Sequence, residues 1–177
     1  DDVSGQGGVL HILAEAALWS GRPDEALQRV AAYARFDGSE YPTSYLVDVV
    51  AGWAAVDAEV PIPPRIAFME PSGMLIGAAH ERVGIERLVA GDLDAAATAF
   101  DEAAGAYVGY HRRGALRARW AAAETRRRSG LTDEARVALE SVEVDAAAQG
   151  FAPLLGRVRR SLRLLGVRRS MSGAASV

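Results

Sequence analysis

The sequence predicts an all-α fold in which antiparallel helix hairpins stack on one another. Two patterns predict it: apolar side chains that recur with helical periodicity, and a glycine-containing motif that is repeated along the chain. Charged residues interrupt every apolar run before it reaches the roughly 18 residues that a membrane-spanning helix needs. We therefore expect a soluble, cytoplasmic protein that does not interact with a membrane.

The clearest single helix is predicted over residues 93–110. Its apolar residues recur at intervals of three and four positions: Leu93, Ala96, Ala97, Phe100, Ala103, Ala104 and Tyr107. This spacing places them on one face of a helix. Phe100 lies at the centre of that face, so we expect it to be buried between the two helices of its hairpin and the next hairpin.

A turn motif occurs three times, with a glycine, an acid three residues later and an alanine five residues later. The copies are Gly21-Asp24-Ala26, Gly91-Asp94-Ala96 and Gly130-Asp133-Ala135. In each copy the glycine ends one helix, the acid stabilises the first turn of the next, and the alanine allows close packing. The copies are 70 and 39 residues apart, and 70 is two periods of about 35, which predicts one degenerate copy between the first two.

The degenerate copy would begin with a helix over residues 45–57. The prolines that follow it, Pro61, Pro63, Pro64 and Pro71, exclude a continuous second helix. We therefore expect the middle repeat to be broken near 58–73. A last helix is predicted over 151–165, so that residues 1–169 form one helical-repeat domain and 170–177 form a flexible tail or linker.

Part of the motif resembles the tetratricopeptide repeat. In the third hairpin Val83-Gly84 corresponds to the Leu-Gly of the first repeat helix, and Ala96, Phe100 and Ala103 match the alanine and phenylalanine positions of the second. Arg87 stands where the repeat has tyrosine. The resemblance implies a tetratricopeptide-like superhelical stack of hairpins.

Residues 105–170 also resemble the end of the helical region of large ATP-binding LuxR-family transcriptional regulators of actinobacterial type. The resemblance lies in Arg117-Ala-Arg-Trp120-Ala, Glu124, Arg127-Arg-x-Gly130, Glu134-Ala-Arg136, Gly150-x-x-Pro153-Leu-Leu155-x-Arg157-Val-Arg-Arg160-Ser161-Leu-Arg163 and Gly166-Val-Arg-Arg169-Ser170. In that family a P-loop ATPase module precedes the repeats and a helix-turn-helix follows them. The resemblance implies a sensor or interaction segment that recognises an inducer or a protein partner and contacts DNA only through a neighbouring domain.

The start of the chain also bears on this function. The chain begins with Asp1 and Asp2 rather than with methionine, so we expect it to be part of a longer polypeptide. A free-standing repeat scaffold for protein assembly is the alternative, and the modules encoded on either side of 1–177 would distinguish the two.

The composition argues against catalysis within the chain. Cysteine and lysine are absent, which excludes thiolate metal sites, cysteine nucleophiles, Schiff-base chemistry and a P-loop lysine. The histidines, His11, His80 and His111, have no second ligand at helical spacing. We therefore expect no enzyme activity, no cofactor and no metal.

Charge is distributed unevenly. Residues 1–109 carry 6 Arg and 17 acids, a net of 6 − 17 = −11, whereas residues 110–177 carry 14 Arg and 6 acids, a net of 14 − 6 = +8. The arginines at 126–128 and 157–169 could contact DNA phosphates without reading a sequence. The interpretation we favour is a solvated helix face whose partners are carboxylates of the acidic half.

A candidate ligand groove follows from equivalent positions on the first helix of each hairpin. Positions six and three residues before a glycine turn include Glu15, Glu124 and Arg127, and Trp19 and Trp120 lie on the same helices. In tetratricopeptide stacks such positions line a concave groove. These five residues predict a mixed aromatic and charged groove, although both tryptophans could instead be core residues.

Overall fold

The structure is a computed structural model that describes residues 3–35, 43–67 and 70–166. Within these ranges every regular element is a helix, which confirms the predicted all-α class. The helices are α1 (Val3–Trp19), α2 (Pro23–Ala34), α3 (Thr43–Ala58), α4 (Met74–Val89), α5 (Leu93–Tyr107), α6 (Arg112–Arg128), α7 (Thr132–Ala148) and α8 (Ala152–Leu164).

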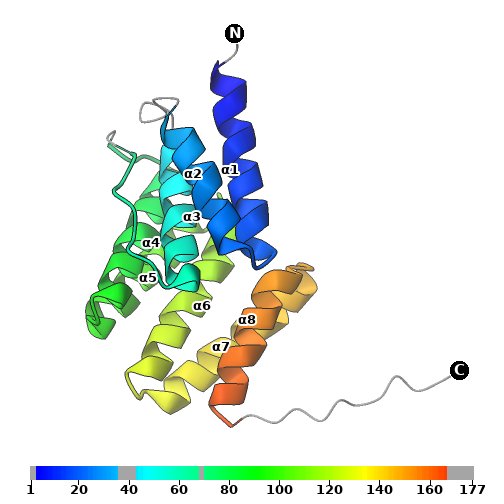
Figure 1. The fold of residues 1–177 in the computed structure, drawn as a ribbon. Coiled ribbons are helices and arrows are strands. Elements are labelled where there is room, and N and C mark those ends of the chain that lie inside the picture. The colour runs from blue at the N-terminus through cyan, green and yellow to red at the C-terminus, as the bar shows by residue number, and fades with distance from the viewer. Residues whose placement is uncertain (1–2, 36–42, 68–69, 167–177) are drawn as a thin grey trace, which may run out of the picture.

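The helices form an inner and an outer set (Figure 1). Helices α1, α3, α4, α6 and α8 form the inner set, and each contacts the next in that order. Each outer helix, α2, α5 or α7, packs between the two inner helices that precede and follow it. This order of contacts agrees with stacked hairpins, and the superhelical, tetratricopeptide-like form of the stack stays a prediction.

The recurring turn motif has the geometry that its residues predict. Gly21, Gly91 and Gly130 have φ values of 73°, 79° and 89°, a left-handed conformation that costs glycine little. In each turn the residue after the glycine donates its N–H to the carbonyl five residues earlier, at 2.9 to 3.0 Å. The alanine of each motif, Ala26, Ala96 or Ala135, is fully buried, which confirms the expected close packing.

Close packing is tightest between α4 and α5. Phe100 is fully buried, as predicted, and lies against the α4 backbone at Gly84, where an added Cβ would be 2.6 Å from the phenyl ring. About two turns earlier in α4, Gly77 leaves the same kind of space for Tyr107. Two glycines on one face of α4 therefore let two aromatic residues of α5 approach its backbone.

The middle repeat lacks its outer helix. Helix α3 ends at Ala58 and α4 begins at Met74, and the described residues between them contain no helix, as the prolines predict. We call residues 59–67 the strap. The strap follows α3 in the place where the other repeats have an outer helix.

Two buried side chains hold the strap. The Asp48 carboxylate accepts hydrogen bonds from the backbone N–H of Ile66 at 2.8 Å and of Ala67 at 3.1 Å. Burial raises the pKa of Asp48, and these two N–H groups partly oppose that effect. Arg82 of α4 donates to the carbonyl oxygens of Asp48, at 2.7 Å, and of Pro63. Side-chain hydrogen bonds thus replace the apolar contacts of the missing helix.

The remaining expectations about organisation are tested in part. No helix in the described ranges is long and apolar enough to cross a bilayer. The predicted linker, 170–177, lies outside the described residues. The last predicted helix corresponds to α8, which begins after Gly150, another glycine of positive φ.

Candidate functional site

A buried ion pair lies at the centre of the inner helices. Glu81 of α4 is fully buried and accepts two hydrogen bonds from Arg117 of α6, at 2.5 and 2.7 Å. The Trp53 indole and the Tyr107 hydroxyl donate to the same carboxylate at 2.8 and 2.9 Å. Four donors from α3, α5 and α6 therefore satisfy one charge, so this cluster ties the helices together and leaves no carboxylate oxygen open for catalysis.

This ion pair and its burial shift the pKa values of the groups around it. The Glu81 carboxylate raises the pKa of Arg117 against the opposing effect of burial. Burial and the nearby Glu81 charge raise the pKa of Tyr107, so its hydroxyl stays protonated and can donate. Glu15 of α1, 3.6 Å from Arg117, brings the first helix to the edge of the cluster.

The charged residues of the predicted groove are held in separate contacts on α1 and α6. Glu15 is half-buried and accepts a hydrogen bond from the Trp19 indole at 3.4 Å, besides facing Arg117. Glu124 and Arg127 pair with each other at 2.7 Å. Burial alone would raise the pKa of Glu124, but hydrogen bonds, chiefly from Arg127, hold it below its ordinary value.

The two tryptophans of the predicted groove are joined by an arginine. Trp120 is only 7% exposed and packs against Trp53, with ring centroids 5.4 Å apart. Trp19 is half-buried and meets Phe151 edge to face at 5.1 Å. The Arg157 guanidinium of α8 lies 5.3 Å from the Trp19 ring and 5.5 Å from the Trp120 ring. Cation–π contacts hold this arginine of α8 against tryptophans of α1 and α6.

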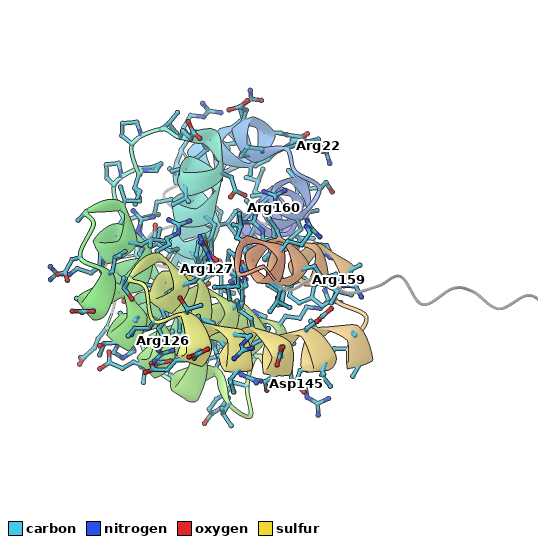
Figure 2. All side chains as sticks on the ribbon, turned by 90° about the horizontal axis from the view of Figure 1, so that it is seen from below. Arg22, Arg126, Arg127, Asp145, Arg159 and Arg160 are labelled. Carbon is cyan, nitrogen blue, oxygen red and sulfur yellow. The ribbon has the colours of Figure 1, made fainter. Side chains whose placement is uncertain are left out.

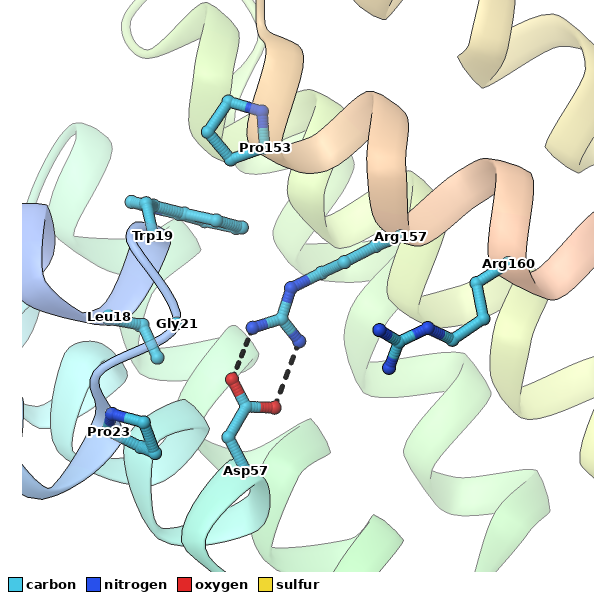
Figure 3. A pocket seen from close by; sticks show the side chains of 8 residues that line it. All are labelled: Leu18, Trp19, Gly21, Pro23, Asp57, Pro153, Arg157 and Arg160. Carbon is cyan, nitrogen blue, oxygen red and sulfur yellow. Dashed lines mark hydrogen bonds and ion pairs between the residues drawn. The ribbon is translucent and has the colours of Figure 1, made fainter.

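A pocket of about 360 Å³ opens beside Arg157 (Figure 3). Its lining comes from the α1–α2 turn, from the end of α3 and from α8: Leu18, Trp19, Gly21, Pro23, Asp57, Pro153, Arg157 and Arg160. Arg157 donates two hydrogen bonds to Asp57, one of them at 3.0 Å, across 100 positions of sequence. Among the described residues, Arg160 has no hydrogen bond or ion pair, and Figure 3 shows its guanidinium extending toward the Asp57–Arg157 pair.

Of the residues that line this pocket, only Trp19 belongs to the groove that the sequence predicts. Sequence reasoning considered Arg157 and Arg160 as possible phosphate contacts, and it did not single out Asp57. No local pattern connects Asp57 to α8, because only the packing of the whole chain brings them together. The two prolines of the lining occupy the first or second position of α2 and α8, where proline is common. Nothing in the sequence indicates that these two helix starts lie close together.

The basic half is partly neutralised from within. Arg117, Arg126 and Arg157 pair with acids of the first half, Glu81, Asp101 and Asp57 respectively. Arg127, which is half-buried, pairs with Glu124, and Arg159 pairs with Glu143. Figure 2 labels these arginines together with Arg160, which is exposed on α8. Carboxylate partners thus neutralise part of the positive charge of residues 110–177. Contact between the exposed arginines and DNA phosphates stays a prediction.

The histidines lie apart from any metal-like cluster. His80 pairs with Glu102 at 2.9 Å, and His111 meets the Tyr107 ring edge to face at 5.4 Å. Within the ranges the structure describes, no group of three or more His, Asp or Glu side chains could hold a metal ion.

Comparison of the chain with protein-family models, with curated proteins and with solved structures finds no match.

Proposed function

We propose that this chain is a non-catalytic recognition segment of a LuxR-type transcriptional regulator. It takes up an inducer or contacts a protein partner, in the cytoplasm, and links an ATPase module to a helix-turn-helix domain, both of which belong to other parts of the polypeptide. DNA is bound through the neighbouring domain. The resemblance of residues 105–170 to the helical region of such regulators supports the setting.

The observation that supports recognition is the pocket between the α1–α2 turn, α3 and α8. It combines an aromatic wall with a cation, Arg160, that has no acidic partner among the described residues. Concave pockets with a few polar groups on an apolar lining are the usual form of a ligand site. Because the pocket joins the first helices to the last, an occupant would contact both ends of the repeat stack at once.

A free-standing scaffold for protein assembly is the second candidate. One observation favours it: α1 exposes large apolar side chains on a single face, where Val9, Ile12 and Leu13 are 56%, 63% and 42% exposed. Their spacing of three and four residues is that of a helix face that packs on another helix. A scaffold would use this face and would need no DNA-binding module.

DNA selection separates the two functions. The product of the complete reading frame and the 177-residue chain would each be titrated, by fluorescence anisotropy, with the promoter duplex of the same gene and with a scrambled duplex at two salt concentrations. We expect the complete protein to select the promoter, whereas the chain alone binds both duplexes equally and weakly, with an affinity that falls steeply with salt. No selection by the complete protein would favour the scaffold. Selection by the chain alone would refute the assignment of residues 112–169 to the repeat region.

A further inference from the structure

We propose that the pocket between the α1–α2 turn, α3 and α8 binds a small organic acid, a single carboxylate on an apolar body. This deepens the proposed function, on which it rests, by naming the chemical class of the inducer. The inference stands on the charges, on the walls of the pocket and on the fixed position of one arginine.

The charges favour a monoanion. The lining contains two arginines, Arg157 and Arg160, and one acid, Asp57, which leaves one positive charge without a partner. A guanidinium can bind a carboxylate with two parallel N–H···O hydrogen bonds. One bound carboxylate therefore balances the pocket, whereas a dianion such as a phosphate ester would leave a negative charge beside Asp57.

Part of the wall can receive an apolar body. The indole of Trp19 and the rings of Pro23 and Pro153 form this part, opposite the charged side chains of the pocket (Figure 3). The volume of about 360 Å³ lies in the range of small-molecule sites. A hydrocarbon or aromatic chain can lie on these side chains while its carboxylate reaches Arg160.

The two arginines have different roles. Arg157 is held between two tryptophans and bound to Asp57, so it keeps the α3 and α8 walls in place. Arg160, one turn further along α8, is exposed and has no partner among the described residues, so it can turn to the ligand without breaking a contact. Arg160 is therefore the anion-binding residue, and Asp57 limits affinity by its negative charge.

Calorimetric titration at pH 7.4 with 4-phenylbutyrate, with its neutral amide and with phenyl phosphate tests the proposal. We expect saturable binding of 4-phenylbutyrate, at least about tenfold weaker binding of the amide, and weaker binding of phenyl phosphate, which is mostly a dianion at this pH.

Arg160→Ala should weaken 4-phenylbutyrate binding by about tenfold or more, whereas Arg163→Ala, an equal change of charge on an exposed α8 residue outside the lining, should leave it unchanged. Asp57→Asn should tighten it. The Trp19 indole N–H signal in a ¹⁵N–¹H spectrum should shift with the same titration curve.

Three results would overturn the inference: equal binding of acid and amide, tighter binding of phenyl phosphate, or equal effects of Arg160→Ala and Arg163→Ala. Absence of saturable binding by the unaltered protein would overturn it as well. A circular-dichroism melt of each variant confirms that it is folded. Promoter selection by the complete protein does not depend on these titrations, so the two proposals can fail separately.

Discussion

Glu81 of α4 connects three further helices, α3, α5 and α6, through its carboxylate. Its carboxylate is buried and binds donors from Trp53, Tyr107 and Arg117. Glu81→Ala removes one partner of a buried ion pair, leaving the Arg117 charge and two other donors without an acceptor. The free energy of unfolding should fall by about 3–5 kcal/mol, as measured by urea denaturation.

Glu102→Ala is the control for that change. Glu102 also belongs to an ion pair, with His80, but its side chain is 54% exposed, and pairs of this kind contribute little. A loss for Glu81→Ala no larger than the loss for Glu102→Ala would show that the buried cluster does not hold the helices together.

Two histidines make stability depend on pH. Burial and the Arg117 charge lower the pKa of His11 and of His111, while Glu15 opposes this effect. The unfolded chain then takes up protons at a higher pH than the folded chain. The free energy of unfolding therefore keeps its full value above about pH 6.5 and falls as the pH drops below it. Urea denaturation at pH 7.5 and 5.5 measures this loss.

A double variant identifies the source of the pH effect. His11→Gln with His111→Gln should remove much of the difference between pH 7.5 and 5.5, whereas His80→Gln, on the exposed face of α4, should retain it. Should the double variant lose as much stability on acidification as the unaltered chain, groups other than these histidines would be responsible.

The α4–α5 hairpin depends on backbone space at one glycine. A Cβ at Gly84 would be 2.6 Å from the Phe100 ring, whereas a Cβ at Gly105 of α5 would meet nothing within 4 Å. Gly84→Ala should therefore destabilise the protein by about 1–3 kcal/mol, because Phe100 is fully buried and cannot withdraw. Gly105→Ala, the same chemical change in an open helical position, should stabilise it by about 0.4–1 kcal/mol. Thermal or urea unfolding that ranks the two variants the other way round would contradict this packing.

Local features of the elements could be predicted from the sequence because their causes are local. Glycine turns, first-turn acids and the proline break set the ends of helices through a few neighbouring residues, and the helix around Phe100 follows from its own periodicity. Trp53 carries no such signal. It reaches Glu81, Phe100 and Trp120 only after three different helices have packed, and the same holds for Asp57 and Arg157.

The predicted groove shows the same division. The sequence predicts that equivalent positions on the first helix of each hairpin line a groove, and the five residues lie on α1 and α6, where each is buried or half-buried. Trp120 became a packing partner of Trp53, and Glu124 bound the arginines of its own helix. Trp19 is the one residue of the predicted groove that lines the pocket beside Arg157.

At the scale of the whole molecule, the first and last helices meet. Trp19 packs on Phe151, which directly precedes α8, and Arg157 of α8 binds Asp57 of α3 (Figure 3). Side chains around the pocket therefore join α8 to α1 and α3. The acid proposed for that pocket would stabilise all three elements by mass action. The proposal therefore implies that ligand binding is coupled to the position of α8.

Hydrogen–deuterium exchange of the 177-residue chain, with and without saturating 4-phenylbutyrate, tests that coupling most directly. The account predicts slower amide exchange in α8, in the α1–α2 turn and at the end of α3 when the acid is bound, with little change in α7, and no such effect in the Arg160→Ala variant. Unchanged exchange in α8 at saturation, or equal protection in the Arg160→Ala variant, would contradict it.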